Sequence, residues 1–229
     1  MKKSVVLLLA LSFVTLQSYK TSPVVLKNEI EVNASILADK FNIDNQAILL
    51  ALTGYEKLKE QGLINNQRYL TIVDFSKPSN EERLYIIDMY NKELPVQTYV
   101  AHGRNSGTLF ATKFSNKQRS NQSSLGFYIT GMPYKGKHGR SLELFGMERG
   151  INDNVKQRAI VLHGANYVSN NFIQHTGYIG RSQGCPAVPN NQINDIIDII
   201  QGQSCLFIYA EDQSYLNKSK IISNVPTTS

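Results

Sequence analysis

The sequence predicts a mainly β domain preceded by a small helical segment. Short runs rich in β-branched and aromatic residues recur from residue 69 to residue 210 with turn residues between them, as is typical of strands. Helical spacing of apolar residues is confined to one stretch before residue 60 and one after residue 190. Hydrophobic residues make up 41% of the 229-residue chain and charged residues 18%, an ordinary balance for a globular protein.

The predicted helices flank the strands. Residues 44–59 carry apolar side chains at helical spacing, Asp44 can cap their N-terminus, and Gly62 can end the helix. A shorter helix is expected over residues 34–41. After most of the strands, residues 191–200 predict one more helix, with isoleucines on its apolar side.

Seven segments are predicted as strands: 69–75, 83–90, 96–101, 126–130, 141–145, 159–162 and 205–210. The second and third are expected to form a hairpin around residues 91–93. Long loops rich in Gly, Asn and Ser are expected at residues 103–124 and 146–155. Loops of this length in a compact domain are usually functional or mobile.

The first residues are typical of a secretory signal peptide. Lys2 and Lys3 precede an apolar run of twelve residues, from 5 to 16, and polar residues follow. Because a bilayer takes roughly 20 apolar residues to span, the pattern predicts export to the periplasm or cell wall, with no transmembrane segment after signal removal. A buried N-terminal helix is the alternative. We divide the chain into a signal peptide (1–19), an N-terminal helical segment (20–66), the β domain (67–212) and a loose polar tail (213–229).

The charge argues against a nucleic-acid partner. The formal net charge is +6, but Lys and Arg are scattered and no predicted helix carries a basic stripe. Two of these charges, Lys2 and Lys3, belong to the predicted signal peptide. A mild positive balance is compatible with an enzyme that works beside an anionic polymer such as a cell wall.

The two cysteines, Cys185 and Cys205, lie in different settings. Cys205 belongs to an apolar run that predicts a buried strand, where cysteine is a small hydrophobe. Cys185 follows Gly184 in a loop of small and polar residues, where no core needs a thiol, and is therefore a candidate nucleophile. A disulfide between the two cysteines is the alternative for an exported protein.

A histidine suited to activate Cys185 precedes it in the sequence. The apolar strand at 159–162 is expected to end on His163, and Cys185 follows 22 positions later. The attacking species is the thiolate, and a neighbouring imidazole can lower the pKa of a thiol from its free value of roughly 8.5. The backbone N–H of Cys185, together with that of Gly184, is a candidate oxyanion hole. A structural histidine beside a surface cysteine is the alternative interpretation.

Several short motifs carry a family resemblance. His-Gly at 163–164 is followed, after a spacer, by Ser-Gln-Gly-Cys at 182–185. With the segments at 123–129, 132–134 and 102–107, these motifs resemble the murein L,D-transpeptidase catalytic-domain family of cysteine L,D-transpeptidases. The Cys-Pro-Ala-Val-Pro at 185–189 resembles one of its subfamilies.

The resemblance covers residues 70–210 and implies a mainly β, L,D-transpeptidase-like β-sandwich whose catalytic domain is the segment 67–212. It implies that Cys185 attacks the third residue of a peptidoglycan stem tetrapeptide, with His163 as base and with Ser182 and Gly184 as further catalytic residues. The acyl group then passes to an amine of a second stem. Family members typically accept carbapenems. The alternatives are an L,D-carboxypeptidase, which uses water as acceptor, and a non-catalytic wall-binding module.

The sequence departs from the family pattern in the nucleophile loop. Gln183 stands where the family has a histidine, and Pro186 and Ala187 replace an aliphatic residue and an arginine that would contact substrate. Arg181 is the candidate for supplying a positive charge instead, with a solvated loop arginine as the alternative.

The remaining candidates come from the loops. Tyr134 and His138 are expected to line the substrate groove, although a surface position is equally compatible with His138. His102 is expected to be structural, with a groove-lining position as the alternative, and His175 is expected to be a solvated loop residue. No histidines show a spacing such as His-x-x-x-His, so neither a metal site nor a cofactor is expected.

A serine-hydrolase elbow is a further alternative, because Gly180 to Gly184 fits Gly-x-Ser-x-Gly around Ser182. That motif needs a strand directly before it and a helix after it, and the sequence offers neither.

Overall fold

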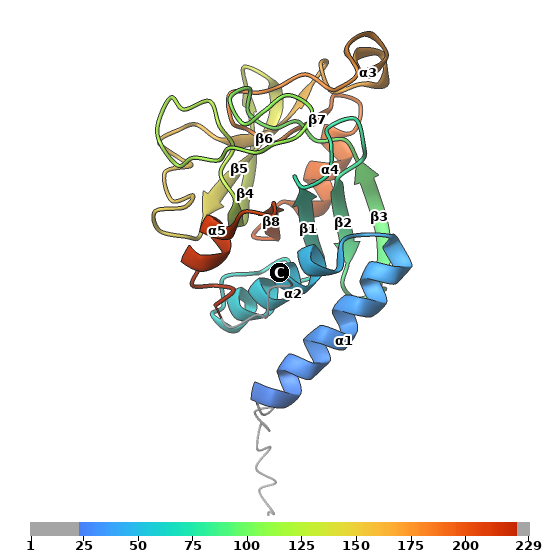
Figure 1. Cartoon of the computed structure of the whole chain (residues 1–229), viewed down its shortest axis with the longest axis vertical. Coiled ribbons are helices and arrows are strands. Elements are labelled where there is room, and N and C mark those ends of the chain that lie inside the picture. The colour runs from blue at the N-terminus through green and yellow to red at the C-terminus, as the bar shows by residue number, and fades with distance from the viewer. Residues whose placement is uncertain (1–22, 224–229) are drawn as a thin grey trace, which may run out of the picture.

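A computed structural model describes residues 23–223, so the predicted signal peptide at 1–19 lies outside the described part. One eight-stranded sheet with the order β3-β2-β1-β8-β4-β5-β6-β7 forms the body of the protein (Figure 1). Its strands are β1 (Tyr69–Asp74), β2 (Leu84–Asp88), β3 (Glu93–Thr98), β4 (Gly126–Gly136), β5 (Gly139–Gly146), β6 (Val161–Ala165), β7 (Ala187–Pro189) and β8 (Cys205–Tyr209). The helices are α1 (Pro23–Phe41), α2 (Asn45–Glu60), α3 (Asn170–Thr176), α4 (Ile193–Ile200) and α5 (Gln213–Lys218).

The mainly β prediction is confirmed, and each predicted strand overlaps a strand of the sheet. Most neighbouring strands are antiparallel, while β1 pairs with β8 and β6 with β7 in parallel. Several strand boundaries differ from the prediction, and one strand is new. Glu93 begins β3 although it was expected in the turn, β4 runs on to Gly136, and β7 had not been predicted. The short strand β7 has no periodicity of its own, because its pairing with β6 is what defines it.

Helix α2 packs against β1, β8 and the start of β4. Asp44 caps it as predicted, accepting a hydrogen bond of 2.7 Å from the backbone N–H of Ala47. Gly54 faces the ring of Phe127, and a Cβ placed at Gly54 would lie only 2.0 Å from the Cζ atom of that ring. Phe127 in turn stacks on Phe207 at 4.2 Å between ring centroids. The helix and the sheet therefore share one core.

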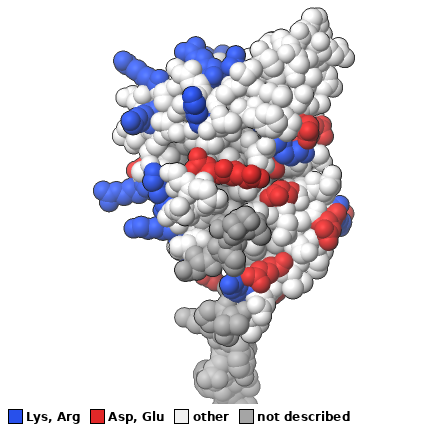
Figure 2. Space-filling view, in the orientation of Figure 1, with Lys and Arg blue, Asp and Glu red and all other residues white. Residues whose placement is uncertain are grey.

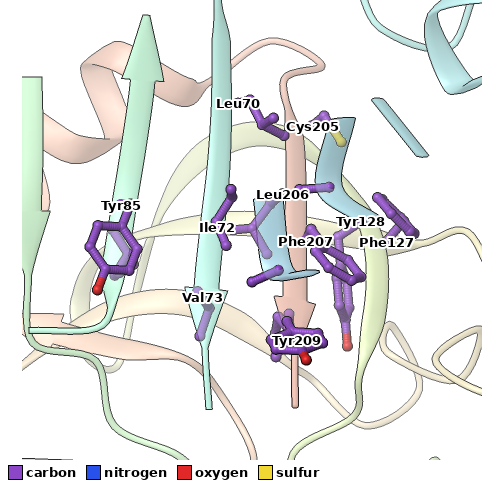
Figure 3. Packing of buried hydrophobic residues seen from close by; sticks show 14 of the residues in the cluster. Leu70, Ile72, Val73, Tyr85, Phe127, Tyr128, Cys205, Leu206, Phe207 and Tyr209 are labelled. Atoms are coloured by element: carbon purple, nitrogen blue, oxygen red, sulfur yellow. The ribbon is translucent and has the colours of Figure 1, made fainter. Parts of the chain in front are cut away.

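Figure 3 shows part of this core, in which side chains of β1, β8, β2 and β4 pack together. Cys205 is fully buried among them, and it is a free thiol. The prediction that Cys205 is a strand-core residue is confirmed, and the alternative disulfide with Cys185 is absent between these two described cysteines.

The ends of the described chain are more structured than expected. Helix α1 begins at Pro23 rather than near residue 34. The segment predicted as a loose tail forms α5, whose Tyr215 is buried and donates a hydrogen bond of 3.2 Å to the buried carboxyl group of Glu148. Ser219 also donates to Glu148, so residues 213–223 are attached through polar contacts that periodicity does not reveal. None of the helices within 23–223 is long and apolar enough to cross a membrane.

The surface charge is unevenly distributed. In Figure 2, most Lys and Arg side chains gather on the left and upper left of the face shown, and most Asp and Glu side chains lie across its middle and on its right. The long loops between residues 103 and 158 contribute many exposed cations: Arg104, Lys113, Lys117, Arg119, Arg149 and Lys156. Cations that are scattered along the sequence thus share the loop-rich part of the fold (Figure 1).

Candidate functional site

Strands β6 and β7 bring the segments of His163 and Cys185 together. His163 pairs in register with Ala187 of the parallel strand β7, which begins two residues after Cys185. The backbone N–H of His163 also donates to the carbonyl of Pro186 at 3.4 Å. The sequence predicted that the strand ends on His163. The residue lies inside β6 instead, because the strand continues through Gly164 to Ala165. Its side chain is buried, with 2% of its surface exposed.

The hydrogen bonding of His163 fixes its tautomer. The Nδ1 atom lies 2.9 Å from the carbonyl oxygen of Gly164. A carbonyl can only accept, so Nδ1 carries the proton and Nε2 keeps a lone pair. Burial lowers the pKa of His163, the hydrogen bond to Gly164 opposes this, and the charges of His138 and Lys137 lower the pKa further, so that it lies below its ordinary value. The imidazole is therefore neutral near pH 7, as a general base must be.

The nucleophile loop is folded around the hydroxyl of Ser182. This hydroxyl donates to the carbonyl of Cys185 at 2.6 Å and accepts from the backbone N–H of Gly184 at 3.0 Å. Ser182 therefore shapes the turn that presents Cys185. Because the N–H of Gly184 is used inside the turn, it is not free to stabilise an oxyanion, which corrects the two-donor oxyanion hole expected from the sequence. The N–H of Cys185 remains as the candidate donor.

Gly184 is required by both its conformation and its surroundings. Its φ of +120° lies in a region that L side chains rarely adopt. A Cβ at this position would lie 2.7 Å from the carbonyl oxygen of Gln122 and 3.1 Å from the Nη2 atom of Arg158. The loop can therefore approach residues 120–124 this closely only with glycine at position 184.

The loop after β3 supports the nucleophile loop from the other side. The N–H of Ser182 donates to the carbonyl of His102 at 2.9 Å, and the N–H of Arg104 donates back to the carbonyl of Ser182 at 2.8 Å. Ser123 connects the two loops, since its hydroxyl accepts from Gly103 and donates to the carbonyl of Gly184. His102 is fully buried, which confirms its structural role.

The thiol of Cys185 lies beside the start of β6. Its Sγ atom is 3.7 Å from the carbonyl oxygen of Ala159. Burial raises the pKa of the Cys185 thiol, whereas the backbone of Val161, the guanidinium of Arg158 and the ammonium of Lys137 act in the opposite direction. Since the balance leaves the pKa above its ordinary value, the resting group is the protonated thiol and needs a base to react.

The tip of the β4–β5 hairpin lies over His163. The ring of His138 stacks on that of His163 with 4.3 Å between centroids and 19° between the planes. Tyr134 pairs with Ser141, and Ser141 pairs with His163, so these residues form one row across β4, β5 and β6. Residues in one such row share a face of the sheet. The exposed Tyr134 thus lies on the face that carries His163.

Two of the predicted loop residues lie further from this row. Arg181 is directed toward the loop after β3, where its Nη1 atom donates to the carbonyl of Gly107 at 3.2 Å and to the hydroxyl of Thr108 at 3.4 Å. His175 is exposed on α3, in a helix rather than the expected loop. No group of three or more His, Cys, Asp and Glu side chains within residues 23–223 is arranged to hold a metal ion.

The sequence did not single out Arg158 or Ser123. Both lie next to the nucleophile loop only because segments distant in the chain meet there: Ser123 and Gly184 are 61 positions apart. Arg158 is one of 24 Lys and Arg residues, and no motif distinguishes it. Its position directly before the apolar residues that lead into β6 was the single available signal.

Comparison with known proteins identifies one family. The family model described as "L,D-transpeptidase catalytic domain" matches residues 39–209, a range that includes α2. A search of curated proteins gave no match.

Solved structures similar to this chain include an L,D-transpeptidase from Mycobacterium smegmatis, with 11% identity, coverage of 62% of this chain and 59% of that one, and a TM-score of 0.38. LdtMt1, an L,D-transpeptidase in complex with imipenem, has 9% identity over 62% and 59% of the two chains, also with a TM-score of 0.38. An L,D-transpeptidase from Stackebrandtia nassauensis has 12% identity over 82% and 92%, with a TM-score of 0.38. The chain spans only 59% and 60% of the length of the first two structures that it matches.

Proposed function

The chain belongs to the L,D-transpeptidase catalytic-domain family, and we propose that it forms a cysteinyl acyl-enzyme with a peptidoglycan stem tetrapeptide and transfers the acyl group to an amine. Membership confirms the family and the L,D-transpeptidase-like fold predicted from the motifs, while the Cys-Pro-Ala-Val-Pro subfamily stays a prediction. We further propose that the chain is exported, as its first 19 residues predict, and works in the periplasm or cell wall.

The observation that best supports the proposal is the pairing of β6 with β7. It brings the turn of Cys185 next to the strand of His163, whose imidazole is neutral and is oriented by the carbonyl of Gly164. A thiol that burial keeps protonated needs such a base, and Nε2 is the atom with the free lone pair. Gly164, the second residue of the His-Gly motif, offers the carbonyl that orients His163, a role that the sequence had not identified.

The proposed chemistry follows from these roles. His163 takes the thiol proton as the sulfur of Cys185 attacks the carbonyl carbon of the third stem residue. The N–H of Cys185 donates to the developing oxyanion. When the tetrahedral intermediate collapses, the bond to the terminal D-alanine breaks and His163 protonates the departing amine. An incoming amine then attacks the thioester, His163 accepts its proton, and the thiolate leaves and takes that proton back from His163, which regenerates the thiol and the neutral imidazole.

Three side chains are proposed to contact the substrate. Tyr134 and His138 lie on or above the face that carries His163. Arg181 holds the loop after β3 through backbone carbonyls, and we propose that it contacts the stem peptide from that side. The exposed cations of the long loops favour an anionic polymer as the surrounding medium.

The nucleophile is tested by intact-mass spectrometry after addition of a carbapenem. Wild-type protein is expected to gain the mass of one carbapenem, Cys185→Ala is expected to gain none, and Cys205→Ala serves as the matched control that keeps the adduct. Circular dichroism checks that both variants fold. Adduct formation on folded Cys185→Ala, or none on wild type, would remove Cys185 from the nucleophile role.

The acceptor is tested with disaccharide-tetrapeptide, alone and with a second tetrapeptide as amine donor. Chromatography is expected to show a crosslinked dimer with loss of D-alanine. Tripeptide as the sole product would identify an L,D-carboxypeptidase instead. Retention of unchanged tetrapeptide on the folded protein would identify a wall-binding module.

A further inference from the structure

Arg158 lies at the centre of the loops beneath the nucleophile. Its half-buried guanidinium donates four hydrogen bonds, all to neutral acceptors of the 115–124 loop. The Nη1 atom reaches the carbonyl of Ser115 at 2.7 Å and the hydroxyl of Ser124 at 2.5 Å. The Nη2 atom reaches the carbonyl of Gln122 at 2.5 Å and the hydroxyl of Ser120 at 3.3 Å. None of the ion pairs formed by residues 23–223 includes Arg158, so its charge is not neutralised by a carboxylate there.

The same guanidinium touches the turn that presents the thiol. A Cβ placed on Gly184 would lie 3.1 Å from the Nη2 atom of Arg158 and 2.7 Å from the carbonyl oxygen of Gln122. The same Nη2 atom donates a hydrogen bond to that carbonyl. On the other side, Ala159, the residue after Arg158, offers its carbonyl to the Sγ atom of Cys185. The guanidinium of Arg158 therefore lies next to the Gly184 turn, and the backbone of the residue that follows Arg158 contacts the thiol.

We propose that Arg158 is a positioning residue for Cys185: it holds the 115–124 loop under the Gly184 turn and supplies the uncompensated positive charge that favours the thiolate. The proposal rests on the proposed function only in taking Cys185 as the nucleophile. An unpaired cation in a half-buried site is screened less by salt than a surface cation. Arg158 thus supplies a positive charge next to the nucleophile loop, in which the side chain of Gln183 is neutral.

Other groups near the thiol do not take over this role. Lys137 on the hairpin tip is exposed, so solvent screens its charge. Tyr167 stays neutral, because burial and the thiolate charge raise its pKa to about 12. His163 is neutral in the resting enzyme and becomes a cation only after it takes the thiol proton. The lasting half-buried positive charge next to the Gly184 turn is that of Arg158. Burial lowers the pKa of Arg158, and the negative charges of ionised Tyr128 and Cys185 would act in the opposite direction.

The test is the rate of alkylation of Cys185 by iodoacetamide as a function of pH, read by intact mass. All proteins carry Cys205→Ala, so that one thiol remains. Arg158→Gln is expected to alkylate on the order of tenfold more slowly at pH 7, because a nearby opposite charge lowers the pKa of an acid by about one unit or more. At a pH above the thiol pKa, its rate is expected to equal that of the parent. Arg158→Lys keeps the positive charge, so its alkylation rate at pH 7 is expected to stay within about threefold of the parent rate. This corresponds to the loss of about half of a one-unit lowering of the thiol pKa.

Asn116→Ala is the matched control for loop position. Asn116 joins the same loop to residues 153 and 154 through its amide, donating to Asp153 at 2.7 Å and accepting from the N–H of Asn154 at 3.1 Å. This variant loosens the loop and leaves the charge of Arg158 in place, so the midpoint of its pH profile is expected to match that of the parent.

An unshifted profile in folded Arg158→Gln overturns the proposal, and so does an equal shift in Asn116→Ala. If Arg158→Gln does not fold, the alkylation rate of Arg158→Lys provides the test. A folded lysine variant that reacts about tenfold more slowly than the parent at pH 7 overturns the proposal. The proposed function can fail separately: a thiol that depends on Arg158 in a protein that leaves the tetrapeptide unchanged would retain this inference and reject the transpeptidase reaction.

Discussion

Replacing His102 by glutamine tests how the loop beneath Ser182 is held. The Nδ1 atom of His102 accepts a hydrogen bond of 2.8 Å from the buried guanidinium of Arg83, and its Nε2 atom donates to the carbonyl of Gly107 at 3.2 Å. Both contacts require the neutral imidazole, because the protonated ring has no acceptor for Arg83. Burial and the charge of Arg83 lower the pKa of His102 to about 4, against an ordinary value of 6.5.

The direction of the pH effect follows from this depressed pKa. Between pH 6.5 and about pH 4 the unfolded chain binds a proton at His102 and the folded protein does not, so acid lowers the free energy of unfolding. The full difference amounts to roughly 3 kcal/mol and the loss at pH 5 to roughly 2 kcal/mol, at 1.36 kcal/mol per pKa unit. His102→Gln keeps the donor to Gly107 but removes the Nδ1 acceptor of Arg83, one of the four hydrogen bonds of that buried guanidinium, which costs about 1–3 kcal/mol at neutral pH.

Urea unfolding at pH 7.5 and pH 5 provides the assay. We expect His102→Gln to be less stable than wild type at pH 7.5 and nearly equal to it at pH 5, because only wild type loses the His102 contribution. Buried carboxyl groups with raised pKa values, such as Glu148, act in the opposite direction but equally in both proteins. A stability difference between the two proteins that stays constant from pH 7.5 to pH 5 would show that His102 does not titrate as the structure requires.

Three further predictions concern packing and the nucleophile turn. Gly54→Ala is expected to destabilise the protein by about 1–3 kcal/mol despite the better helix propensity of alanine, since the new Cβ meets Phe127; unchanged stability in urea would contradict this. Cys205→Ala is expected to cost on the order of 1 kcal/mol in urea with an unchanged acylation rate, and a changed rate would contradict the core role. Gly184→Ala is expected to slow acylation by carbapenem more than tenfold (on the order of 1–3 kcal/mol of strain), because of its φ and of the close carbonyl of Gln122; stopped-flow kinetics near the wild-type rate would contradict this.

The sequence alone determined the features that are local in the chain. The helix after Asp44 was predicted with its cap, and the strand around Cys205 was predicted as core, because periodicity and capping depend on neighbouring residues. The motifs around His163 and Cys185 were enough to identify the family, which the match over residues 39–209 confirms.

Tertiary structure decided everything that depends on segments distant in sequence. It extended β6 through His163, which pairs with Ser141 of β5 and with Ala187 of β7, and it thereby set the Cys185 turn against that strand. It also attached α5 to the rest of the protein through Glu148. Arg158 was one cation among many until folding placed its guanidinium beside Gly184, where it forms no ion pair with a carboxylate of residues 23–223. The effect of a charge depends on its distance from other groups and on its exposure to water, and both are set only when the chain packs.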